Sequence, residues 1–329
     1  MDITAFKDKN VLITGGLGFI GSNLAIRLIE AGAKVTLVDS LIPTYGGNLF
    51  NIEPVKYRAR VNISDVRDQH AMKYLVANQD YLFNLAGQTS HLDSMEQPEI
   101  DLNINVLAQL HILEACRLHN PNLRLIFAST RQIYGRPIYL PVDENHPLNP
   151  VDVNGINKLA GEQYHRLYYD VYGIRSTILR LTNTYGPRMR IKDARQTFLG
   201  IWIKRLLQGQ PMQIFGDGRQ VRDYNYVDDV VDAMLITALA QNAYGEVYNL
   251  GSEQDLTLTE TAQIMSDLHP SAGFEYVDFP PSRKSIDIGN YQGSFEKIKR
   301  ELGWQPRTDF NEGMRQTIAY YQQHLEKYL

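Results

Sequence analysis

The stretch TGGLGFIG at residues 14–21 directly follows a short apolar run and opens a helical pattern. Gly15 and Gly18 let the backbone turn tightly and approach a pyrophosphate, and Gly21 lets the helix pack closely on the strand. The first turn of that helix offers free N–H groups to an anion. This arrangement of strand, glycine turn and helix predicts a dinucleotide-binding site.

Short β-branched runs alternate with helical stretches through the first half of the chain. They lie at residues 11–14, 35–39, 81–85 and 123–128. Strands that are buried on both faces and separated by helices form parallel sheets. We therefore predict an α/β protein with a Rossmann-type doubly wound parallel sheet, whose ligand binds beyond the carboxyl ends of the strands.

Asp39 closes the second strand, at the place where a carboxylate can accept both ribose hydroxyls of a dinucleotide. The same carboxylate repels a 2′-phosphate, so the predicted cofactor is NAD rather than NADP. Asp65 and Val66 follow the third strand and are placed to contact the adenine. Asp65 or Ser64 can equally be the N-cap of the next helix.

The regular alternation of predicted strands and helices ends after about Pro187. A long helix is expected around residues 197–207, followed by short strands and two terminal helices near 294–302 and 311–328. We predict an NAD-binding Rossmann domain over residues 1–187, to which later segments return, and a smaller C-terminal α/β substrate lobe mainly over residues 188–329.

Composition restricts the kind of ligand and the cellular setting. The 329 residues carry 33 Lys and Arg against 37 Asp and Glu, without the basic excess of a nucleic-acid-binding protein. No apolar run has the length of a membrane span, and residues 1–10 lack the apolar core of a signal peptide. The single cysteine, Cys116, lies in an apolar helical pattern and is expected to be a buried side chain. These features predict a soluble cytoplasmic protein with a small ligand and no metal site.

Further blocks of sequence recur at characteristic spacings after the glycine stretch. They are NLAG at 84–87, STRQIYG at 129–135, LRLTNTYGPR at 179–188, FGDG at 215–218 with RDY at 222–224, and LGWQP at 302–306. With these blocks the chain resembles, over essentially its whole length, the extended short-chain dehydrogenase/reductase family of nucleotide-sugar epimerases and dehydratases. The resemblance implies that a nucleoside-diphosphate sugar lies between the lobes against a bound nicotinamide, and that hydride leaves a ring carbon, usually carbon 4, and can return.

The resemblance, together with the glycine and aspartate positions above, assigns a set of residues to the NAD site. They are Gly15, Gly18, Phe19, Ile20, Gly21, Asp39, Asp65, Val66, Leu85, Ala86, Gly87 and Lys158.

Members of this family use a triad of Ser or Thr, Tyr and Lys, in which Tyr and Lys are four residues apart on one helix face. The lysine ammonium lowers the pKa of the phenol, so that a phenolate can take the hydroxyl proton as hydride leaves. Thr130 and Lys158 match two members of the triad, but the residue four before Lys158 is Asn154. An amide cannot act as a base near neutral pH, so Asn154 is expected to position a hydroxyl and another group must remove its proton.

Three groups can replace the missing tyrosine as the base. Thr130 can pass its proton towards Lys158 or the ribose, and Lys158 can itself have a lowered pKa beside a bound cofactor. His91, in the loop beyond the fourth strand, can reach the sugar or can simply be a solvated histidine.

The residues after Thr130 bear on the type of reaction. Dehydratases of the family carry an acidic pair there, whereas this chain has Arg131 and Gln132, which cannot act as carboxylic acids. A 4,6-dehydratase is therefore disfavoured. Arg131 can bind an anionic substituent of the sugar, or can be a solvated or diphosphate-facing arginine.

The resemblance also implies substrate contacts and an oligomer. Arg222, Arg283 and Asn183 match positions at which relatives hold the substrate diphosphate. Helices near residues 102–116 and 156–171 carry apolar side chains on more than one face, which by analogy form an intersubunit four-helix bundle of a homodimer. Burial against their own sheet is the other interpretation.

We therefore predict an NAD-dependent nucleotide-sugar epimerase, an isomerase that acts through a transient 4-keto sugar. Two alternatives stay open: a nucleotide-sugar dehydrogenase or other oxidoreductase, and a catalytically silent protein that binds NAD and a nucleotide sugar.

Overall fold

The computed structural model describes residues 2–195 and 197–329. Within this part of the chain, seven strands form one parallel sheet in the order β10-β6-β5-β4-β1-β2-β3. Its strands are β1 (Asn10–Thr14), β2 (Lys34–Asp39), β3 (Arg60–Ile63), β4 (Tyr81–Asn84), β5 (Arg124–Thr130), β6 (Ser176–Leu181) and β10 (Val247–Leu250). The prediction of a Rossmann-type doubly wound sheet is confirmed.

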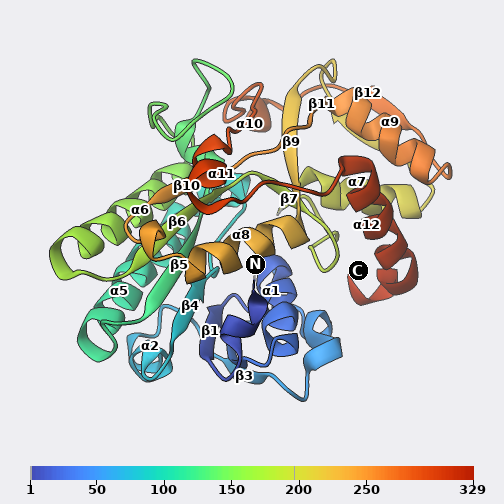
Figure 1. The fold of residues 1–329 in the computed structure, drawn as a ribbon. Coiled ribbons are helices and arrows are strands. Elements are labelled where there is room, and N and C mark those ends of the chain that lie inside the picture. The colour runs from blue at the N-terminus through green and yellow to red at the C-terminus, as the bar shows by residue number, and fades with distance from the viewer. Residues whose placement is uncertain (1, 196) are drawn as a thin grey trace.

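Helices cover both faces of this sheet (Figure 1). One face carries α1 (Phe19–Glu30), α8 (Val227–Leu239) and α11 (Glu296–Leu302), and the other carries α2 (Gln69–Val76), α5 (Ala108–His119) and α6 (Val153–Tyr172). Alternate residues of each strand pack into the cores on the two faces of the sheet, because successive side chains of a strand point to opposite faces. Val11 and Ile13 pack with α1 and α8, whereas Leu12 packs with α5.

The chain between β4 and α5 is broken into short pieces that lie above the sheet edge. They are α3 (His91–Glu96), α4 (Pro98–Leu102) and a π-helical turn over Asn103–Leu107 that runs directly into α5. The helix expected near 102–116 therefore begins with a π-turn, a feature that is frequent at functional sites. As expected, Cys116 is buried, on the core-facing side of α5, where burial raises the pKa of its thiol to about 12.

A second lobe is built around its own apolar core. Its elements are β7 (Asn183–Tyr185), β8 (Met212–Phe215), β9 (Val221–Tyr226), β11 (Asp255–Thr257), β12 (Phe274–Val277), α7 (Phe198–Leu207), α9 (Leu258–Leu268), α10 (Pro281–Lys284) and α12 (Phe310–His324). In Figure 1, α7, α9 and α12 gather on the side away from α5 and α6. Because β10 and α8 belong to the large sheet, segments beyond residue 187 return to the first lobe. The domain boundary itself stays a prediction.

No helix in the two described ranges combines the length and the apolar character that crossing a membrane requires.

Candidate active site

A cavity of about 810 Å³ opens beyond the carboxyl ends of the parallel strands and extends to the second lobe. The first lobe lines it with the glycine turn, Asp39 and Lys158, and the second lobe contributes Arg222 and Arg283. This is the place where doubly wound sheets bind their ligands.

The glycine turn has the geometry of a dinucleotide site. Gly15 adopts a left-handed backbone with φ +67°, and a Cβ on Gly21 would lie 2.3 Å from the carbonyl oxygen of Gly15. A side chain at Gly21 would therefore push the helix off the turn, as the sequence predicts. Gly18 is the N-cap of α1 and has no side chain to occupy the N–H groups of the first turn. The residues present fit a bound pyrophosphate.

Asp39 lies at the end of β2 and lines the cavity. Its two carboxylate oxygens accept hydrogen bonds from the backbone N–H groups of Leu17 and Leu41, at 3.0 and 2.9 Å. Burial raises the pKa of this carboxyl, and the two hydrogen bonds oppose that shift. Each oxygen keeps a second lone pair, so the carboxylate can still accept ribose hydroxyls.

Asp65 and Val66 line the cavity as expected for residues near an adenine. Asp65 accepts hydrogen bonds from the backbone and guanidinium of Arg67. The alternative that Asp65 or Ser64 caps the next helix is wrong. The cap of α2 is Asp68, whose carboxylate accepts from the N–H groups of His70 and Ala71.

Lys158 is 7 % exposed and donates a hydrogen bond to the carbonyl of Ala128 at 3.1 Å. Burial lowers the pKa of its ammonium to about 8, against the opposing attraction of Asp101 and Glu162. A Cβ on Gly87 would lie 3.1 Å from its Nζ, so this glycine leaves the ammonium open to the cavity. Thr130, the last residue of β5, lines the same cavity and accepts a hydrogen bond from the N–H of Gln132 through Oγ1.

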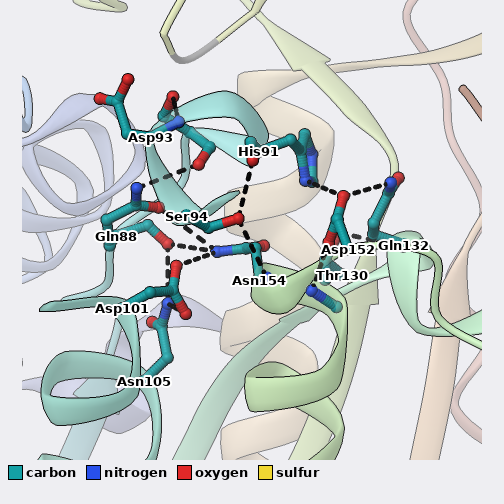
Figure 2. Close-up of polar contacts among 12 residues, drawn as sticks. Gln88, His91, Asp93, Ser94, Asp101, Asn105, Thr130, Gln132, Asp152 and Asn154 are labelled. Carbon is teal, nitrogen blue, oxygen red and sulfur yellow. Dashed lines mark hydrogen bonds and ion pairs between the residues drawn. The ribbon is translucent and has the colours of Figure 1, made fainter. Parts of the chain in front are cut away.

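Asn154 is 2 % exposed and its amide is committed to the protein (Figure 2). Nδ2 donates to the carbonyl of Gln88 at 2.8 Å and to Oδ2 of Asp101 at 3.0 Å. The backbone N–H of Asn154 donates to Oγ of Ser94 at 3.2 Å. Asn154 therefore ties the start of α6 to the segment from Gln88 to α4, and its two amide protons are not available to a substrate hydroxyl.

His91 is the first residue of α3 and is not a freely solvated loop side chain. Its Nδ1 lies 2.9 Å from Oδ2 of Asp152, a carboxylate with no exposed surface. Asp152 is the N-cap of α6, where Oδ1 accepts from the N–H of Gly155, while Oδ2 also accepts from Nε2 of Gln132. Burial alone would raise the pKa of Asp152, but His91, Gly155 and Gln132 together lower it. Sequence reasoning missed Asp152, although an Asp directly before a helical stretch is a preferred N-cap residue.

Three arginines lie at the end of the cavity where the substrate diphosphate is expected. Arg131 is half-buried over the ring of Tyr291 and donates through Nη2 to Asn183, whereas its Nη1 has no hydrogen-bond partner in the described ranges. Arg222 is paired with Asp287, and Arg283 stacks on Phe215. Burial lowers the pKa of Arg131, and the neighbouring charge of Arg222 adds to this effect.

Fold and site together define a dinucleotide-dependent enzyme with a cavity that both lobes line. The profile of the NAD dependent epimerase/dehydratase family matches residues 11–251. A putative UDP-glucose 4-epimerase from Methanocaldococcus jannaschii is 36 % identical over 94 % of this chain and 97 % of its own. The chain belongs to the NAD dependent epimerase/dehydratase family.

Solved structures agree with this assignment. An epimerase from Methanothermobacter thermautotrophicus has a TM-score of 0.92 at 28 % identity, covering 98 % of this chain and 95 % of its own. A UDP-glucose 4-epimerase from Thermotoga maritima, solved with UDP-glucose, has a TM-score of 0.88 at 31 % identity, covering 96 % and 99 %. Dehydratases are also among the relatives. The prediction of an NAD-dependent enzyme of this family is confirmed, and epimerisation is the activity that these relatives best support.

Proposed function

We propose that this protein inverts carbon 4 of a UDP-hexose through a transient 4-keto sugar. The observation that carries the proposal is that the buried Lys158 and Thr130 line one cavity, which the glycine turn, Arg131, Arg222 and Arg283 also line. Bound NAD supplies a reversible hydride acceptor. The uridine part of the proposal is supported by the relatives, which are named for UDP-sugars.

Each residue has a defined task in this proposal. The glycine turn holds the pyrophosphate of the dinucleotide and Asp39 holds its adenosine ribose, and Lys158 hydrogen-bonds the nicotinamide ribose with the ammonium protons that face the cavity. Thr130 holds the ring hydroxyl at the carbon that is oxidised. Lys158 also places a positive charge where the hydroxyl oxygen becomes negative, which favours oxidation.

The residues after Thr130 support epimerisation over dehydration. Arg131 and Gln132 form the short helical turn that follows β5, and Gln132 donates its side-chain amide to Asp152. Neither side chain can protonate a leaving hydroxyl group. Elimination of water, which needs that protonation, therefore lacks its acid at this position.

We propose that the arginine cluster binds the diphosphate. Arg222 is buried and Arg131 is half-buried, and the charge of Arg222 acts on Arg131, an arrangement that a dianion between the two guanidinium groups would stabilise. Alternatively, Arg131 can bind an anionic substituent on the sugar.

Arg283→Ala is expected to weaken UDP binding by about 1.5 to 3 kcal/mol, because a hydrogen bond to a charged group contributes about that much. Isothermal titration with UDP measures the change, and Arg300→Ala on α11, which is paired with its neighbour Glu301 at the surface, is the control. Equal affinities of Arg283→Ala and the wild type would remove Arg283 from the diphosphate site.

Product analysis distinguishes epimerisation from the two alternatives, a nucleotide-sugar dehydrogenase and a catalytically silent binding protein. An epimerase changes the configuration of the sugar with no net NADH, a dehydrogenase accumulates NADH, and a silent binding protein does neither. A panel of UDP-hexoses incubated with the protein and NAD, followed by proton NMR and absorbance, distinguishes the three.

We further propose a homodimer through α5 and α6, which lie side by side in Figure 1. Exposed apolar side chains on these helices include Leu118, Ile156 and Leu167. Leu167→Glu is expected to convert a dimer to a monomer, as measured by light scattering, because it places charge in the shared face. Tyr57→Glu alters an exposed aromatic residue elsewhere and should leave the dimer intact. A wild-type chain that is monomeric would contradict the proposal.

A further inference from the structure

We infer that His91, oriented by Asp152, is the acid and base that replaces the missing tyrosine. The inference rests on the proposed function, since it assigns the proton transfer of that reaction. Figure 2 shows the two side chains meeting beside Thr130 and Gln132, and His91, Thr130 and Lys158 line one cavity.

The His91 imidazole lies close to a carboxylate at one nitrogen and has no partner at the other within the described ranges. Nδ1 lies 2.9 Å from Oδ2 of Asp152, and no hydrogen bond engages Nε2 within the ranges that the structure describes. The Nδ1–H direction is not yet aligned with the carboxylate, as is common for catalytic hydrogen bonds that tighten with substrate. A buried carboxylate at Nδ1 favours the proton on Nδ1 and leaves Nε2 able to accept one.

The loss of tyrosine is coupled to the placement of His91 through Asn154. Ser94 Oγ donates to the carbonyl of His91 at 2.7 Å and accepts from the N–H of Asn154. Asn154 Nδ2 also holds the carbonyl of Gln88, three residues before His91. The contact with Ser94 uses the backbone of residue 154, which any residue supplies, whereas the contact with Gln88 depends on the asparagine side chain. Asn154 and Asp152 are positioning residues, and His91 is the catalytic one.

Charged groups face His91 from α6, from α3 and from the second lobe. Asp152 faces Nδ1 from α6, and on α3 itself Asp93 is paired with Arg195, which approaches from the second lobe. Lys158 and Asp101 lie beyond Asn154. An imidazolium formed at His91 is therefore stabilised by the buried carboxylate that touches it.

Oxidation of the sugar removes one proton and one hydride from the same C–OH group. The proton of the ring hydroxyl passes to Nε2 of His91, while the hydrogen on the same carbon leaves with its two electrons as hydride to the oxidised nicotinamide, so that a C=O bond forms. In the return step hydride adds to the other face of the carbonyl, and the His91 imidazolium gives its proton back to the oxygen. The product is the inverted alcohol, with the cofactor oxidised again.

The test uses His91→Gln, His91→Ala and Asp152→Asn. His91→Gln is expected to lower kcat by about 10²- to 10⁴-fold, the range of general acid and base catalysis, with a smaller change in KM. Added imidazole should restore part of the activity of His91→Ala and none of that of Lys158→Met. Asp152→Asn keeps the N-cap oxygen but presents an amide to Nδ1, so it should lower kcat in the same range without unfolding α6.

Matched controls and a readout independent of turnover accompany these variants. Asp68→Asn changes the cap of α2, and His119→Gln changes an exposed histidine at the end of α5, so both should keep wild-type kcat. Nitrogen-15 NMR of the ring should show the Nδ1–H form of His91 in the wild type and a shift towards the Nε2–H form in Asp152→Asn.

The outcomes separate this inference from the proposed function. If the wild type inverts no UDP-hexose, the proposed function fails. If the wild type does invert one while His91→Gln keeps its kcat, or imidazole rescues nothing, His91 is not the base and the epimerase assignment stands.

Discussion

Replacing Lys158 with methionine is expected to lower turnover by about 10²- to 10⁴-fold while leaving the fold intact. The ammonium can both hydrogen-bond the nicotinamide ribose and stabilise a developing alkoxide. Methionine fills a similar volume without charge, and it removes the desolvation cost that lowers the pKa of the lysine. We expect an unchanged or higher melting temperature together with the loss of kcat. Lys34→Met, at the exposed start of β2, is the control. Wild-type turnover in Lys158→Met would contradict the proposed mechanism.

The lowered pKa of Lys158 also predicts how the wild type responds to pH. Turnover should decline as the pH rises through about 8, because the ammonium loses its proton there. Stability should change in the opposite direction. The unfolded chain, with a lysine pKa near 10.5, binds more protons than the folded protein between about pH 8 and 10.5, so this group favours folding increasingly as the pH rises through that window. Lys158→Met should lack both responses.

Asn154→Tyr is expected to abolish activity rather than restore it. Tyrosine would return the family's usual acid and base to its helical position, which a pocket that had merely lost that group would accept. Asn154, however, is buried and its amide clamps Gln88 and Asp101. The phenol ring overpacks this site and leaves the Asp101 carboxylate without one of its donors, which together cost about 2 to 4 kcal/mol of stability.

Asn154→Ala removes the amide hydrogen bonds without adding volume, so it separates these two effects of Asn154→Tyr. It should lower stability by about 1 to 3 kcal/mol through the unpaired acceptors, and turnover by less than Lys158→Met does. Thermal unfolding and kcat of both variants give the comparison. Higher turnover in Asn154→Tyr than in the wild type would show that the pocket still fits a tyrosine and that Asn154 is not a clamp.

The parts of this molecule that follow from local chemistry could be predicted from the sequence. The glycine turn needs φ values and close approaches that only glycine allows, so Gly15 and Gly21 mark the start of α1 directly. Strand period and helix spacing likewise determine the parallel sheet.

Contacts between distant segments could not be predicted in this way. His91 meets Asp152, and Asn154 meets Gln88 and Asp101, only because α3, α4 and the start of α6 pack at one sheet edge. The pairing of Arg222 with Asp287 has the same origin. The N-cap of α2 could not be predicted either, because Ser64, Asp65 and Asp68 are all suitable residue types. The cap is Asp68 because α2 starts at the next residue.

Incubation of the protein with NAD and a UDP-hexose in D₂O tests the central claim most directly. The account predicts a 4-epimer whose carbon-4 hydrogen is the original one, with no deuterium from solvent on the ring and no accumulated NADH, because hydride leaves and returns within one site. A product lighter by one water, deuterium on the sugar carbons, or a steady rise of NADH would contradict it.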